Sequence, residues 1–186
     1  MYKLLLLGLL ATSASSSAEV SEELVYGHYE AKASPGRSLA EILNDSSPFR
    51  PQGKVFHSAT GWNVDWKFQT RSLPNGRCRI VRVATHLSGQ IDLPRLVDAD
   101  AGIESRFEDY LGALRVHELG HFAIGKEAAV AVDKKLRALP EMPSCEALES
   151  RARDLGARIL GEYEAKGNRY DVETGHGRTQ GAWLGE

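Results

Sequence analysis

Two histidines and a glutamate, His117, Glu118 and His121, have the spacing of a metal site. Residues i and i+4 of an α-helix lie on the same face one turn apart, so His117 and His121 can offer two imidazole nitrogens to one cation. Glu118 lies beside the first histidine but off the ligand face, where its carboxylate can accept a proton from a metal-activated water molecule. The pattern therefore predicts one Zn²⁺ per chain and a general base.

The sequence around this motif favours a helix. No proline interrupts residues 99–139, and apolar residues recur there every three or four positions together with the two histidines. The stripe consists of Phe107, Tyr110, Leu114, His117, His121, Ile124, Ala128 and Val132. Two histidines that face a core are difficult to satisfy with hydrogen bonds alone, so their placement favours metal ligation over a structural role.

Residues 1–18 have the pattern of a secretory signal: Lys3, an apolar run over residues 4–11, and small residues that end at Ala18. We expect cleavage after Ala18 and export to the periplasm or the extracellular space. The apolar run is much shorter than the ~20 residues of a membrane-spanning helix. We expect no membrane span in the mature chain.

The mature chain, residues 19–186, is predicted to form a single domain, because the composition is that of an ordinary globular protein with 42% hydrophobic and 26% charged residues. The formal net charge is −2, and the lysines and arginines are scattered among acidic residues. This distribution argues against nucleic acid as a partner.

The mature chain has two cysteines, Cys78 and Cys145. An exported protein meets an oxidising environment, so we expect these two residues to form a disulfide. A Cys-ligated metal is disfavoured, because the sequence has no Cys-x-x-Cys spacing.

The part of the chain before about residue 95 is predicted to be rich in strands. Apolar and polar residues alternate over residues 56–68 and 81–93, with a turn at residues 74–76 and an end at Pro94, which predicts an antiparallel hairpin. Its aromatic residues, such as Trp62 and Trp66, are assigned to the core face and not to a substrate-binding surface. A short strand over residues 25–31 and a short helix over residues 39–44 precede the hairpin.

The part from residue 99 to residue 186 is predicted to be helical and to contain the metal site. After the central helix over residues 99–139, Ser144 offers an N-cap for a last helix, which we expect to end near Lys166 at Gly167 and Asn168. The expected fold is α+β, with the hairpin packed on the central helix and the last helix.

A polar segment follows, and residues 170–177 read Tyr-Asp-Val-Glu-Thr-Gly-His-Gly. With the signal sequence, the His-Glu-x-x-His motif and the cysteine pair, this segment makes the chain resemble a bacterial family of predicted secreted zinc-dependent proteases, grouped as the domain of unknown function 922. The resemblance extends over nearly the whole mature chain. It implies a zincin-like fold and a metallopeptidase site.

A catalytic zinc needs a third protein ligand. His176 is the leading candidate, because its motif has no evident packing role. Glu127 lies six residues after His121, where metzincins place a histidine, but a continuing helix would point it elsewhere. Asp171 is the third candidate, as a ligand or, like Thr174, as a hydrogen-bonding support for an imidazole.

The sequence thus predicts a secreted zinc metallopeptidase that acts on peptides or proteins. Glu118 is the expected general base, and Tyr170 is the candidate donor to the developing oxyanion. The alternative is an exported, metal-stabilised domain that binds an envelope component without turnover.

Overall fold

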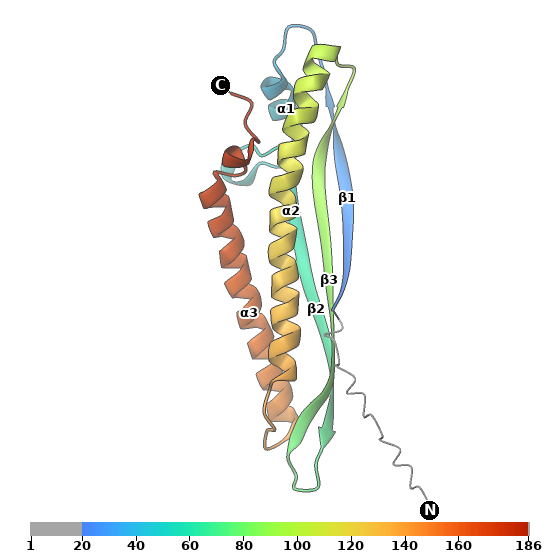
Figure 1. Ribbon diagram of the computed structural model, residues 1–186, viewed down its shortest axis with the longest axis vertical. Coiled ribbons are helices and arrows are strands. Elements are labelled where there is room, and N and C mark those ends of the chain that lie inside the picture. Colours follow the sequence, from blue (N-terminus) through green and yellow to red (C-terminus); the bar gives the residue numbers. More distant parts are fainter. Residues whose placement is uncertain (1–19, 186) are drawn as a thin grey trace, which may run out of the picture.

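The computed structural model describes residues 20–185, so the predicted signal sequence lies outside the described residues. Within this range the molecule is elongated, and its long strands and helices run along one axis (Figure 1). The elements in chain order are β1 (Val20–Lys32), α1 (Leu39–Ser46), the 3-10 turn η1 (Pro51–Gly53), β2 (Ala59–Ser72), β3 (Cys78–Val97), α2 (Ala101–Arg137), α3 (Cys145–Thr174) and the 3-10 turn η2 (Arg178–Gln180). The predicted α+β class is confirmed.

The strands form a sheet in the order β1-β3-β2. The predicted hairpin is present, since β2 and β3 pair antiparallel, whereas β1 adds to the other side of β3 as a parallel strand. The antiparallel pairing of the hairpin ends at Asp92, just before Pro94, as expected, but β3 itself continues to Val97 and pairs Pro94 with Tyr29 of β1. The fixed φ of proline is compatible with an extended backbone, so only one hydrogen-bond donor is lost there.

One face of the sheet is covered by α2, and α3 packs beside α2. The predicted aromatic core face is confirmed, because Trp62 packs against Gly125 of α2 and Trp66 packs against Gly156 of α3. A Cβ atom at either glycine would lie less than 3 Å from the indole ring, so these helices approach the sheet closely only because both residues lack a side chain. The partly buried indoles therefore belong to the contact between the sheet and the helices.

The short helix predicted over residues 39–44 is α1. Its start has a complete capping box, in which the Ser38 side chain accepts from the Glu41 backbone N–H and the Glu41 side chain accepts from the Ser38 backbone N–H. Leu39, Ile42 and Leu43 of this helix are buried. They anchor the segment that leads to β2 and to the site described below.

The last helix is longer than the sequence predicts. Gly167 and Asn168 do not end it, and α3 continues to Thr174, where Gly175 takes the left-handed conformation with φ of 57°. A glycine inside a helix costs only about 1 kcal/mol, which tertiary contacts can offset. Here Tyr170 and Thr174 pack against α2, so tertiary contacts offset the local preference. Tyr170 and Asp171 therefore lie on a regular helix instead of in a polar tail.

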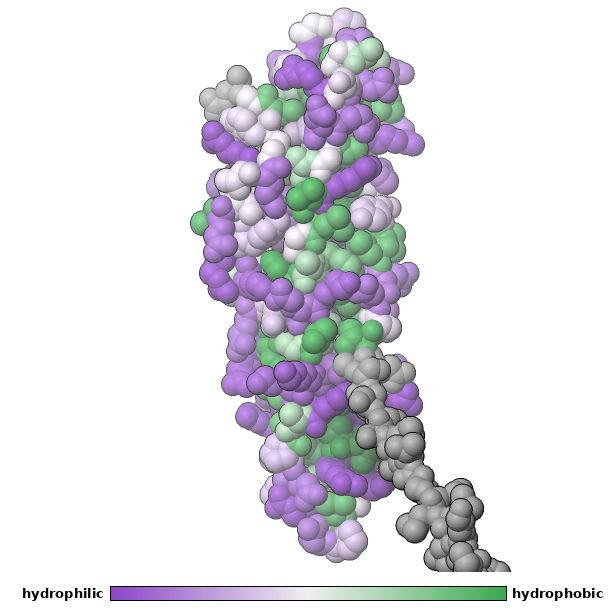
Figure 2. Space-filling model, viewed as in Figure 1, coloured by the Kyte–Doolittle hydropathy of each residue, from purple (hydrophilic) through white to green (hydrophobic). Residues whose placement is uncertain are grey.

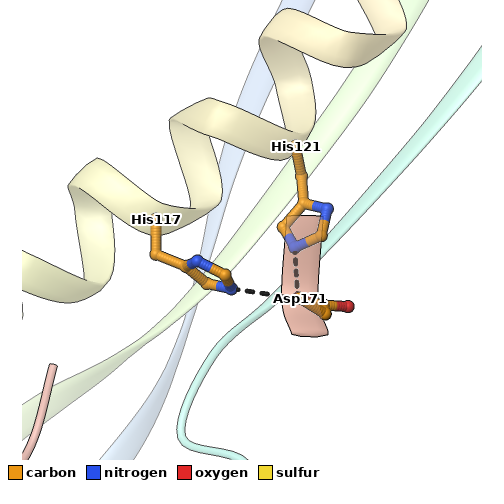
Figure 3. A group of neighbouring side chains, drawn as sticks. All are labelled: His117, His121 and Asp171. Atoms are coloured by element: carbon orange, nitrogen blue, oxygen red, sulfur yellow. Dashed lines mark hydrogen bonds and ion pairs between the residues drawn. The ribbon is translucent and has the colours of Figure 1, made fainter. Parts of the chain in front are cut away.

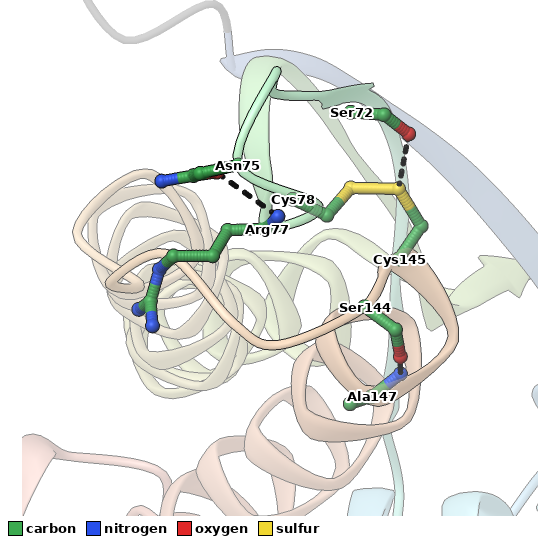
Figure 4. The surroundings of a disulfide bond; sticks show 7 residues. All are labelled: Ser72, Asn75, Arg77, Cys78, Ser144, Cys145 and Ala147. Carbon is green, nitrogen blue, oxygen red and sulfur yellow. Dashed lines mark hydrogen bonds between the residues drawn. A yellow bond between two sulfur atoms is a disulfide. The ribbon is translucent and has the colours of Figure 1, made fainter.

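The predicted disulfide between Cys78 and Cys145 is present (Figure 4). It joins the start of β3 to the start of α3, and Cys78 also exchanges backbone hydrogen bonds with Met142. These contacts fix the end of the molecule at which the β2–β3 turn and the α2–α3 connection meet.

The visible face of the molecule carries mostly hydrophilic side chains, with smaller hydrophobic areas between them (Figure 2). Among residues 20–185, none of the helices has the length and apolar character needed to cross a membrane.

Candidate metal centre

The middle of α2 and the end of α3 meet in one half of the molecule, and the residues of the His-Glu-x-x-His motif lie there (Figure 1). Both His117 and His121 point from α2 toward Asp171 of α3 (Figure 3). The two helices are antiparallel neighbours, so residues about fifty positions apart in the sequence face each other.

The carboxylate of Asp171 contacts both imidazoles. Its Oδ1 atom lies 3.2 Å from Nε2 of His117 and 2.8 Å from Nε2 of His121. The potential ligand atoms of the three residues all lie within 4.8 Å of one another. Over residues 20–185, this is the single group of three or more His, Cys, Asp or Glu side chains with such a geometry.

The charges in this group are strongly coupled. Burial raises the pKa of Asp171, but hydrogen bonds from His117 and His121 and the charges of nearby histidines outweigh that effect and hold it well below its usual range. Burial lowers the pKa of His117, yet its hydrogen bonds to Asp171 and Gln180 and the neighbouring carboxylates raise it overall. An ionised carboxylate only accepts hydrogen bonds, so protons on the imidazoles occupy the same positions that a divalent cation would take.

The orientation of His117 is fixed by its second ring nitrogen. The Nδ1 atom lies 3.0 Å from Oε1 of Gln180, and since an amide oxygen can only accept, the imidazole donates from Nδ1. Nε2 then carries the lone pair that faces Asp171 in the neutral ring. Metal-ligating histidines usually have such a partner, which sets their tautomer. The hydroxyl of Thr174 lies 3.5 Å from the same Nδ1 atom and donates to the carbonyl oxygen of Tyr170.

Tyr170 packs between the two histidines and the helix backbone. Its ring stacks on His117 with a centroid distance of 5.1 Å, and its hydroxyl donates to the backbone carbonyl of His117 and accepts from the Gln180 amide. A Cβ atom at Gly120 would lie 2.1 Å from this hydroxyl, so the glycine of the motif makes room for the tyrosine. Tyr170 is not among the residues that line the cavity described below. Its position supports a role in holding His117, and the oxyanion role stays a prediction.

The carboxylate of Glu118 is nearly buried, with 4% of the residue exposed. One of its oxygens accepts from the Ser58 hydroxyl and the other from the Thr60 hydroxyl, both at 2.5 Å. Because both donors belong to β2 or the residue just before it, the sheet fixes the orientation of this side chain. Glu118 also lines the cavity described below, and its role as a general base stays a prediction.

His176, the leading sequence candidate for the third ligand, lies next to the group but outside it. Its Nδ1 atom is 3.6 Å from Oδ1 of Asp171, and about half of its side chain is exposed. Its ring packs edge-on against the ring of Phe56, with 4.9 Å between the two ring centroids. The structure brings Asp171, not His176, between His117 and His121. The third ligand itself stays a prediction, with Asp171 now the better placed candidate.

Glu127 lies away from this site. Its carboxylate pairs with Lys166 on the outer side of α2 and α3, and it does not line the cavity. The helix continues through residue 127, which is why the spacing of a metzincin third ligand does not bring this side chain toward the histidines.

A cavity of about 1080 Å³ opens beside the three-residue group. Its wall includes His117, Glu118, His121 and Asp171 together with residues from the segments 48–60 and 175–185. This volume is comparable with the roughly 300–1,000 Å³ of sites that hold small molecules.

The donor set fits zinc. Two imidazole nitrogens and one carboxylate oxygen are the ligand types and number of a catalytic zinc site, and the three residues lie at the wall of a cavity. The Gln180 contact supplies the outer support that such a site requires.

The sequence predicts no role in the site for three residues that contribute to it: Gln180, Ser58 and Thr60. The two hydroxyls lie on the alternating stripe of a strand, where they look like ordinary core-facing positions. Gln180 follows a glycine-rich stretch without periodicity. Only the return of the chain after Gly177, whose φ is 84°, brings it back to His117.

Comparison with known proteins gives one family match. The family described as "Bacterial protein of unknown function (DUF922)" matches residues 26–177. No curated protein and no solved structure matches the chain. The matched segment includes the candidate ligands on α2 and α3, the glutamate and both cysteines.

Proposed function

We propose that this chain, which belongs to the bacterial family DUF922, is an exported zinc-dependent peptidase. One observation carries the proposal: Nε2 of His117, Nε2 of His121 and Oδ1 of Asp171 converge at the wall of a cavity that Glu118 also lines. The disulfide supports export, because such bonds persist in oxidising compartments.

In this proposal the protein holds Zn²⁺ through His117, His121 and Asp171. When bound, zinc would supply a Lewis acid that lowers the pKa of a water molecule toward ~7 and polarises the substrate carbonyl. The carboxylate of Glu118 would accept a proton from the attacking water and later deliver it to the amine nitrogen of the leaving group. Ser58 and Thr60 would hold that carboxylate in place throughout.

The choice of zinc rests on the donors and the neighbouring base. Two histidines and one carboxylate also suit Fe(II) in oxygenases. The glutamate directly after His117, held toward the cavity, favours hydrolysis, because proton transfer from water is the step that such a residue serves. Metal analysis of the protein isolated after export distinguishes the two metals.

The cavity favours turnover over the alternative of an exported binding domain without catalysis. A purely structural metal site is commonly closed by four protein ligands. Here three candidate donors lie at the wall of an open cavity.

The experiment compares the exported protein with its Glu118→Gln variant on a mixture of synthetic peptides, with products identified by mass spectrometry. We expect cleavage by the parent, loss of cleavage on zinc chelation with recovery on re-addition, and at least a hundredfold loss in Glu118→Gln at unchanged zinc content, as expected for removal of a general base. Cleavage by Glu118→Gln at the parent rate would refute the assigned role. A zinc-loaded parent that cleaves none of the peptides would favour the binding domain.

A further inference from the structure

We infer that the cavity beside the candidate metal centre selects peptides that carry a carboxylate close to the bond to be cleaved. The inference rests on the proposed function, because it names the substrate class of the same site. It follows from the charges on the cavity wall.

The charged residues of the wall are unevenly distributed. Its cations are Arg50, Lys54 and Arg178, and its acids are Glu118 and Asp171. Both acids are engaged at the centre of the site, Glu118 by two hydroxyls and Asp171 by two imidazoles. The part of the wall that a substrate side chain would meet therefore carries only positive charge, although the whole chain has a net charge of −2.

The chain segments that carry two of the cations meet beside the candidate ligands. The ring of Phe56 contacts the ring of His176, which in turn lies 3.6 Å from the Asp171 carboxylate. Lys54 precedes Phe56 by two residues, and Arg178 follows His176 by two residues. The contact between the two rings thus joins the two segments, and each of them contributes one basic residue to the cavity wall.

These cations are available to a ligand. The guanidinium of Arg178 lies over the Trp183 ring, 4.0 Å from its centroid, which leaves the N–H groups at its edge free to donate to a carboxylate. Within residues 20–185, no hydrogen bond or ion pair engages the ammonium of Lys54. Arg50 differs, because its guanidinium donates to the backbone carbonyls of Asn44 and Asp45 near the end of α1. We therefore assign recognition to Lys54 and Arg178.

The carboxylate could belong to an acidic side chain or to the C-terminus of the peptide. Four matched peptides separate these sources: each contains either Glu or Gln at one fixed internal position, chosen within two residues of the cleaved bond where cleavage is found, and each ends in either a free carboxylate or an amide. Binding is measured with the Glu118→Gln variant loaded with zinc, and kcat/KM is measured with the parent. Binding does not depend on turnover, so the inference can be tested even when no peptide is cleaved.

We expect peptides with a carboxylate to bind roughly tenfold more tightly than the Gln amide, since each partly exposed ion pair contributes up to about fivefold. The preference should fall as salt is raised. Lys54→Gln and Arg178→Gln should each reduce it about threefold, whereas Arg178→Lys should retain most of it. Lys67→Gln is the matched control, because Lys67 is an exposed cation of β2 outside the cavity.

Equal binding of all four peptides, or a preference that Lys54→Gln and Arg178→Gln leave unchanged, would overturn the inference. If the parent nevertheless cleaves peptides, the proposed function stands although the inferred carboxylate selectivity does not. If a carboxylate preference is found but the zinc-loaded parent cleaves nothing, the proposed function fails, and of the inference only the selection of carboxylate peptides by the cavity remains. Preference for the free C-terminus over internal Glu would identify the terminal carboxylate as the recognised group.

Discussion

The Nδ1 atom of His117 lies 3.0 Å from the side-chain oxygen of Gln180, although the two residues are 63 positions apart. Since this contact sets the tautomer of His117, we expect Gln180→Leu to weaken zinc binding roughly 10- to 100-fold, the usual range for loss of such a partner. Zinc affinity is measured by competition with a chromophoric chelator.

Two further variants test this prediction. Gln180→Glu retains an acceptor for the Nδ1 proton and should bind zinc more tightly than Gln180→Leu. Thr179→Ala changes the exposed neighbour and should bind like the parent. Equal affinities for Gln180→Leu and the parent would show that the tautomer is set by something else.

The identity of the third ligand is tested by metal analysis of four alanine variants. We expect His117→Ala, His121→Ala and Asp171→Ala each to lose stoichiometric zinc, because a site with two protein ligands binds the ion weakly. His176→Ala should retain most of it, since His176 lies outside the group of converging ligand atoms. Loss of zinc in His176→Ala together with its retention in Asp171→Ala would instead support the ligand predicted from the sequence.

The hydroxyls of Ser58 and Thr60 should affect catalysis without affecting the metal. Because each donates to one oxygen of the Glu118 carboxylate, Ser58→Ala and Thr60→Val are expected to lower kcat about tenfold each, less than the 10²- to 10⁴-fold contribution of a general base. Zinc content and KM should change little. A fall in zinc content equal to the fall in kcat would contradict a role in placing the base.

Removing the disulfide should destabilise the fold. The bridged cysteines are 67 residues apart, so the chain-entropy description gives a stabilisation of roughly 4 kcal/mol for the closed loop. We expect a Cys78→Ala, Cys145→Ala double variant to lose about 2–4 kcal/mol in its free energy of unfolding. Urea unfolding of the variant and of the parent, with and without reductant, measures this difference, and unchanged stability in all four samples would contradict it.

The pH dependence of stability should report on His57, which lines the cavity and contacts Tyr110 and Asn44. Burial lowers its pKa from 6.5 to about 4. Between these values the unfolded chain binds more protons at this residue than the folded chain does, so stability falls as pH falls. The stabilisation is complete above pH ~6.5 and is lost as the pH passes through about 4.

After allowance for partial exposure of the ring, this effect is on the order of 2 kcal/mol. Urea unfolding of the parent and of His57→Gln at pH 7 and pH 4 isolates it, because the other histidines are common to both proteins. The parent should lose more stability on acidification than His57→Gln does. Equal losses, or a His57 ring that titrates near pH 6.5 by NMR, would contradict the prediction.

The periodic parts of the chain were predictable from the sequence, and the boundaries were not. Alternation identified the hairpin, and the three-to-four spacing identified α2 with its histidine pair, because each pattern reflects one buried face. Gly167 and Asn168 pointed to a helix end, but packing of Tyr170 on Gly120 and His117 keeps α3 helical to Thr174. That continuation decides which side chain meets the histidines.

The same continuation explains why the leading candidate for the third ligand changes from His176 to Asp171. On a helix, Asp171 faces α2, whereas His176 follows the left-handed Gly175 and turns toward Phe56. Local sequence signals carry no information on which of two nearby polar residues the tertiary fold will bring to a third, so only the contact between α2 and α3 could resolve the choice.

The separation of His121 and Asp171 by 50 residues has a consequence for the order in which the site arises. During synthesis at ~5–20 residues per second, the histidine pair leaves the ribosome roughly 3–10 s before its carboxylate partner. A growing chain thus contains the α2 motif while the donor set is still incomplete. Under the proposed function, the chain can hydrolyse peptide bonds only after α3 has been synthesised and has docked on α2. An unfinished chain therefore cannot cleave neighbouring proteins.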